Sequence, residues 1–144
     1  MMYRLFIRSF LASCLMFVLS GCVSHDEKPK PPGPTTLSKV YPGDIGKVDQ
    51  IILLDGSTGG REYVQDKQEI RAFLDRIKDE VLSPDPNQED RVGFIYGITL
   101  QEKEETKLAF TLNSIQGIYY QDNPGFREVV RGLFEKAFNK KFGY

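Results

Sequence analysis

The chain is poor in the side chains on which many catalytic and metal sites depend. Its 144 residues include two cysteines, one histidine and no tryptophan. Cys14 lies inside an apolar N-terminal run, and His25 lies in a proline-rich stretch in which nothing fixes the orientation of its ring. Nucleophilic catalysis needs a histidine whose ring is held in place, and a thiolate zinc site or a disulfide framework needs several cysteines in the folded domain, whereas no cysteine follows residue 22. We therefore expect no metal, no cofactor and no enzyme activity.

Long apolar runs are also missing. The longest, residues 10–19, is shorter than the roughly 20 residues that a membrane-spanning helix needs. Arg4 and Arg8 precede it and small residues follow it, which is the layout of a secretory signal. We therefore expect residues 1–21 to be a signal peptide that is removed on export.

The apolar run ends in the tetrad Leu19-Ser20-Gly21-Cys22. An apolar residue, two small residues and a cysteine in this order resemble the lipobox of bacterial lipoproteins. The resemblance implies cleavage before Cys22 and acylation of its sulfur, with Leu19, Ser20 and Gly21 recognised by the signal peptidase. Two or more acyl chains, at about 0.8 kcal/mol for each buried methylene, make such an anchor effectively permanent. The alternative, an ordinary secretory signal, would leave a reactive free thiol at the mature N-terminus.

The whole chain resembles the small lipoproteins of Gram-positive bacteria, which carry a lipobox, a proline-rich tether and one compact domain. This resemblance implies a lipid-anchored protein on the outer face of the cytoplasmic membrane. Val23 stands where an aspartate would act as a retention signal, so we expect the outer membrane in a cell with two membranes. Residues 22–39 are polar and proline-rich, and we expect them to form an extended tether.

Charge excludes one class of partner. Without Arg4 and Arg8, the 19 basic residues of the chain fall to 17, against 20 acidic ones. A mildly acidic exported domain has no electrostatic reason to bind nucleic acid. The expected partners are the membrane, through the lipid anchor, and an envelope or membrane protein.

Residues 40–144 are numerous enough for a single domain with one core. Residues 51–54 and 61–64 flank a glycine-rich stretch, which predicts a β-hairpin. Asp66 is expected to cap a helix, with Glu69 as its partner three positions later. The apolar residues of this helix recur at helical spacing: Ile70, Phe73, Leu74 and Ile77.

Three more strands and a second helix are expected in the C-terminal half. Residues 92–100, 108–112 and 115–120 have the period-two pattern of an antiparallel meander. Pro124 then opens a helix whose apolar stripe runs to Phe138. The order ββαβββα predicts an α+β fold, with an antiparallel sheet of about five strands and two helices on one face.

Two acidic clusters are candidate sites. Asp85, Asn87 and Glu89 are spaced like the start of a calcium loop, but Asp90 stands where the sharp turn requires glycine, so a solvated loop is favoured. Glu102, Glu104 and Glu105 could act as paired acid and base, but they lie in a predicted hairpin turn, where carboxylates are expected to remain exposed.

A surface is the remaining candidate site. If the bulky residues of the meander, Phe94 among them, face the helices, small and weakly polar side chains occupy the opposite face. Such a face is either simply solvated or a docking platform for a partner. The predicted interaction surface consists of Ile95, Thr99, Ala109, Thr111 and Tyr119.

Three hypotheses of function follow from this sequence. The leading one is a lipid-anchored binding or interaction module of the cell envelope. The second is a carboxylate-dependent hydrolase of envelope glycans that uses Asp49, Asp55 or Glu102. The third is a structural envelope protein without a stoichiometric partner.

Overall fold

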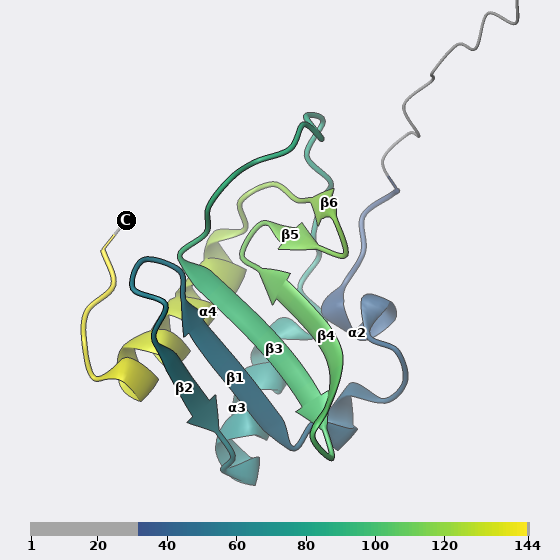
Figure 1. Ribbon diagram of the computed structural model, residues 1–144. Helices are drawn as coiled ribbons and strands as arrows, with labels where there is room; N and C mark the ends of the chain where they lie inside the picture. The colour runs from purple at the N-terminus through teal and green to yellow at the C-terminus, as the bar shows by residue number, and fades with distance from the viewer. Residues whose placement is uncertain (1–31, 144) are drawn as a thin grey trace, which may run out of the picture. The chain divides into compact units, whose positions relative to one another are not determined.

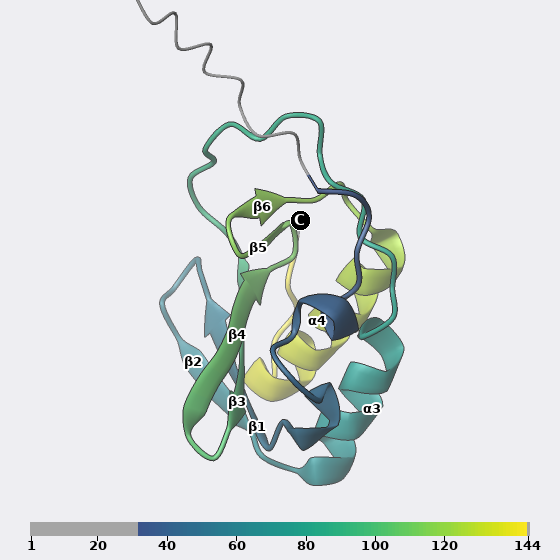
Figure 2. The same cartoon turned by 90° about the vertical axis from the view of Figure 1, so that its right-hand side faces the viewer.

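The computed structural model describes residues 32–143. The predicted signal peptide, the lipobox with Cys22 and the first part of the predicted tether lie outside the described residues. The described part confirms the α+β class: an antiparallel sheet has both long helices on one face (Figures 1 and 2). None of the helices in this part of the chain is long and apolar enough to cross a membrane.

The sheet contains six strands in the spatial order β2-β1-β3-β4-β5-β6. The strands are β1 (Gln50–Asp55), β2 (Arg61–Val64), β3 (Tyr96–Glu102), β4 (Glu105–Thr111), β5 (Ser114–Ile115) and β6 (Ile118–Tyr119). The helices are α2 (Leu37–Val40), the 3₁₀ helix η1 (Ile45–Lys47), α3 (Lys67–Ile77) and α4 (Pro124–Phe138).

Both long helices begin where their capping residues predict. The side chain of Asp66 accepts a hydrogen bond from the backbone N–H of Glu69 at 2.8 Å, and Asn123 caps α4 in the same way. The Glu69 carboxylate lies 2.8 Å from the ammonium of Lys136, so it ties α3 to α4 instead of turning back to the cap.

The core lies between the helices and one face of the sheet. Alternate residues of β1, Ile51 and Leu53, are fully buried there, as the period of two requires. The apolar stripe of α3 predicted from the sequence is buried against them. From α4 and the chain after it come Phe126, which packs against Phe110, and a cluster of three aromatic rings: Phe134, Phe138 and Phe142.

The structure differs from the sequence prediction at several element boundaries. β3 begins at Tyr96 rather than at residue 92, and Val92 is completely exposed. The last predicted strand is divided into β5 and β6 because Gln116 and Gly117, both with positive φ, turn the chain between them. Leu37, within the predicted tether, is fully buried in the core.

Candidate functional site

Three of the predicted interaction residues lie together on the face of the sheet without helices. Thr99 of β3 and Ala109 of β4 are directly opposite each other, and Ile52 of β1 is opposite Thr99. Tyr63 of β2 is opposite Ile52 and is 57% exposed. Tyr63, Ile52, Thr99 and Ala109 therefore form an uncharged row across four strands, which we call the open-face row. Thr111 lies beside it, opposite Gly97.

Phe94 also lies on this open face, and the expectation that it faces the helices is wrong. Gly97 pairs with Leu54, which alternates with the buried residues of β1 and so points away from the helices. A Cβ at Gly97 would lie 3.0 Å from Cε2 of the Phe94 ring, so the ring covers Gly97 on the open face. The sequence prediction failed here because Phe94 precedes β3, where the alternation of a strand does not apply.

Ile95 and Tyr119, the two other predicted interaction residues, make contacts that hold neighbouring segments of the chain together. The carbonyl oxygen of Ile95 accepts a hydrogen bond from the backbone N–H of Gly56 at 2.8 Å. The hydroxyl of Tyr119 accepts a hydrogen bond from the backbone N–H of Arg91 at 3.0 Å, and the guanidinium of Arg91 lies 4.8 Å from the centre of the Tyr119 ring. These contacts hold the loop before β3 against both β6 and the turn after β1.

The calcium-like acids in that loop stabilise the loop itself. Arg91 donates a hydrogen bond to Asp85 at 2.6 Å, and this contact is the main reason why the pKa of Asp85 lies below its usual range. Asn87 accepts a hydrogen bond from the N–H of Glu89 at 2.9 Å, as in a local turn. No group of acids, histidines or cysteines in residues 32–143 is placed to hold a metal ion.

The three acids of the hydrolase hypothesis do not share one site. Asp49 precedes β1 and Asp55 ends it, so they lie at opposite ends of the strand. Asp49 lies near Glu102, and both of its carboxylate oxygens accept from the N–H of Lys103, at 2.9 and 3.1 Å. Glu102 accepts from the Tyr41 hydroxyl at 2.6 Å; burial of Tyr41 and this contact raise the pKa of the phenol.

Asp55 is the one charged side chain with a fully buried position among the described residues. Its carboxylate accepts hydrogen bonds from the Ser57 N–H at 2.9 Å and the Thr58 hydroxyl at 2.8 Å. Lys140, from the segment after α4, lies 2.5 Å away and supplies the opposite charge. The Lys140 hydrogen bond is the largest cause that lowers the pKa of Asp55, to about 2.

This shift predicts acid sensitivity. Folding lowers the Asp55 pKa from 3.8 to about 2, so the unfolded chain takes up the proton more readily. The ionised carboxylate should therefore contribute about 2 kcal/mol above pH 4, and that contribution should be lost as the pH falls from about 4 to 2. Urea unfolding at a series of pH values should show a shallower acid slope for Asp55→Asn than for the native protein. Equal slopes would contradict the prediction.

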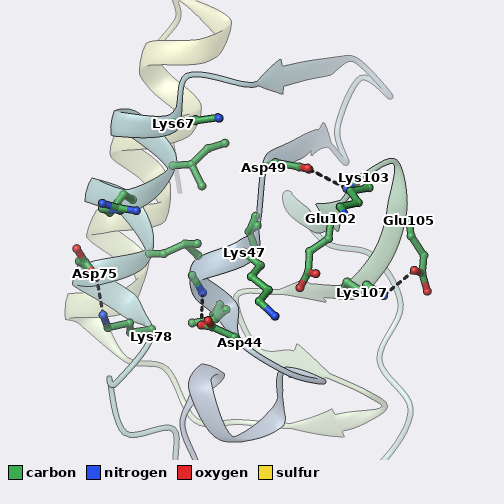
Figure 3. A pocket seen from close by; sticks show the side chains of 16 residues that line it. Asp44, Lys47, Asp49, Lys67, Asp75, Lys78, Glu102, Lys103, Glu105 and Lys107 are labelled. Atoms are coloured by element: carbon green, nitrogen blue, oxygen red, sulfur yellow. Dashed lines mark hydrogen bonds and ion pairs between the residues drawn. The ribbon is translucent and has the colours of Figure 1, made fainter.

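A charged groove lies at the end of the sheet that carries the turn between β3 and β4. It has a volume of about 1030 Å³ and is lined by α3, by η1 and by the turn between β3 and β4. Figure 3 shows Lys67 and Lys78 on the helix side, Lys103 and Lys107 on the hairpin side, and Lys47 between them. Most of its lining residues are charged, so this is a polar site rather than an apolar pocket.

Two ion pairs neutralise part of the charge on the groove walls. At the C-terminal end of α3 the ammonium of the capping residue Lys78 lies 2.5 Å from the Asp75 carboxylate, and on β4 the Lys107 ammonium lies 2.6 Å from Glu105. Each hydrogen bond is the main reason why the pKa of its lysine is raised. Each pair connects residues two or three positions apart on the same wall, so neither joins the two walls.

The groove could not be found from local sequence patterns. Its cationic residues come from positions as distant as Lys47, Lys67 and Lys103, and in each segment they look like ordinary surface charges. The contact between Lys140 and Asp55 is likewise not visible in any local pattern, because the two residues lie far apart in the sequence. Comparisons with protein families, with curated proteins and with solved structures find no match to this chain.

Proposed function

We propose that this protein is a lipid-anchored binding module of the cell envelope that holds a protein partner on the open face of its sheet. The lipobox-like tetrad that ends in Cys22 supports the anchor, which would hold the domain on the outer face of the cytoplasmic membrane. The observation that carries the binding role is the open-face row, because both long helices pack on the other face and leave it uncovered (Figure 2).

The chemistry of the row defines the partner surface. The row contains no charge, and Phe94, 43% exposed, extends its apolar character beyond the four strands. A partner that covers it must be flat, largely uncharged and rich in aliphatic or aromatic side chains, since an unpaired charge buried here would cost several kcal/mol. The partner that fits is therefore another envelope protein with an apolar face, and the module holds it without transforming it.

Crosslinking and affinity capture from the protein's own membranes test this proposal. We expect one partner in near-equal amount, and Cys22→Ala, which removes the proposed lipid attachment, should reduce its capture. Turnover of a substrate by the purified protein would contradict the proposal, as would capture of nothing above background.

A pair of matched variants tests whether the open face makes the contact. Ala109→Glu places a charge in the row, and Ala72→Glu places the same charge at an exposed position on α3. Because the first charge would be buried unpaired under the partner, Ala109→Glu should lower capture about tenfold or more, while Ala72→Glu should leave it unchanged. Equal capture by both variants would exclude the open face as the binding surface. Thermal unfolding of each variant controls for loss of the fold.

A further inference from the structure

The charged groove contains acids whose carboxylates accept hydrogen bonds that stabilise the fold. Besides the two acids in ion pairs, Asp44 accepts from the N–H of Gly46 at 2.9 Å and caps η1. Asp49 holds the turn between β3 and β4 through the N–H of Lys103, and Glu102 accepts from Tyr41. These three acids are held by uncharged donors, so their negative charges are not neutralised by their fold contacts.

Four cationic side chains of the groove make no comparable stabilising contact among the described residues. Lys67 and Arg71 lie one turn apart on α3, Lys47 lies on η1, and Lys103 lies in the hairpin turn. Within residues 32–143, no ion pair involves any of these four side chains, and all four residues are exposed. Cations without partners on three separate elements therefore face one concave site.

These charges select a ligand by its charge pattern. A purely anionic ligand would meet the three carboxylates held by uncharged donors, and a purely cationic one would meet the four cations; like charges brought together reduce affinity. A ligand with groups of both signs, spaced along its length, avoids both penalties. The volume of about 1030 Å³ is at the upper end of the range for small-ligand sites.

We propose that the groove binds a short zwitterionic peptide, with its anionic groups on Lys67, Arg71 and Lys103 and its cationic group beside Glu102. None of the lining residues belongs to the open-face row, so this ligand is distinct from the proposed protein partner. Binding of the peptide in the groove does not require the lipid anchor. The peptide proposal and the protein-partner proposal can therefore fail independently of each other.

Calorimetric titration of the full-length protein in an uncharged detergent tests the charge pattern. Four tetrapeptides with acetylated and amidated ends serve as probes: Lys-Glu-Lys-Glu, all-Glu, all-Lys and all-Gln. At low ionic strength we expect the mixed peptide to bind at least about fivefold more tightly than each of the others, and this advantage to shrink in salt. Equal affinity for the all-Glu peptide, equal affinity for all four, or no binding would overturn the proposal.

Neutral variants locate the binding. Lys67→Gln and Lys103→Gln each remove a cation that has no ion pair in the described part of the chain, and each should weaken binding of the mixed peptide severalfold without loss of stability. Lys39→Gln is the matched control, because Lys39 is also exposed and lies outside the groove. If all three variants bind the peptide equally well, the groove is not its site.

Discussion

Replacing Gly56 with alanine should destabilise the protein by about 3 kcal/mol, a typical upper value for overpacking at a closely packed position. A Cβ at this position would lie 1.9 Å from the carbonyl oxygen of Phe94 and 2.9 Å from its carbonyl carbon. Both are backbone atoms, so no side-chain rotation relieves the clash. The loop must move away, and the 2.8 Å hydrogen bond from Gly56 to Ile95 breaks with it. Urea unfolding of the full-length protein measures the change.

Gly132 provides the matched control for this substitution. It lies in the middle of α4, where a Cβ would meet no atom within 4 Å. Alanine has the better helix propensity, so Gly132→Ala should stabilise the protein by about 0.5 to 1 kcal/mol. If Gly56→Ala instead unfolds within about 0.5 kcal/mol of the native protein, the close approach of the two backbones does not constrain the fold.

Removing the Lys140 side chain should also destabilise the protein by about 3 kcal/mol, because the buried Asp55 carboxylate would lose the opposite charge that Lys140 supplies. The ammonium also lies 4.5 Å from the centre of the Phe142 ring, and this cation–π contact is lost with it. The midpoint of urea unfolding for Lys140→Ala at neutral pH measures the effect.

The neighbouring lysine is the control. Lys141 pairs with Glu135 at 3.0 Å, but its side chain is 91% exposed, so Lys141→Ala should cost less than about 0.5 kcal/mol. In a double-mutant cycle, Asp55→Asn should be less harmful in the Lys140→Ala background than in the native protein. Additive effects of the two substitutions would show that Lys140 and Asp55 do not stabilise each other.

The element order was predictable because its signals are local. The apolar spacing within α3 and the Asp66 cap identify that helix without knowledge of the rest of the chain. The hairpin tip at residues 103 and 104, both with positive φ, likewise follows from a short charged turn between two alternating strands. The predicted element boundaries were wrong where an alternating pattern continues beyond the end of a strand, as at Phe94.

The candidate sites were only partly predictable. Alternation placed Thr99, Ala109 and Thr111 on one face, and the register of β3 with β4 brings them together as predicted. The sequence leaves open whether Tyr63 belongs to this surface, because the pairing of β2 with β1, and of β1 with β3, determines which residues complete a row. Residue type alone groups the acids Asp49 and Asp55, but the length of β1 separates them.

The sequence alone determined the fold class, the order of β1 to β4 and the two long helices, and the burial of the α3 stripe, because periodicity and capping depend on residues a few positions apart. The lipid anchor at Cys22 remains a prediction of the sequence. Only the tertiary structure decided where isolated charges meet. The approach of Lys140 to Asp55 and the gathering of Lys47, Lys67 and Lys103 around one groove depend on how strands and helices pack, which no local pattern records.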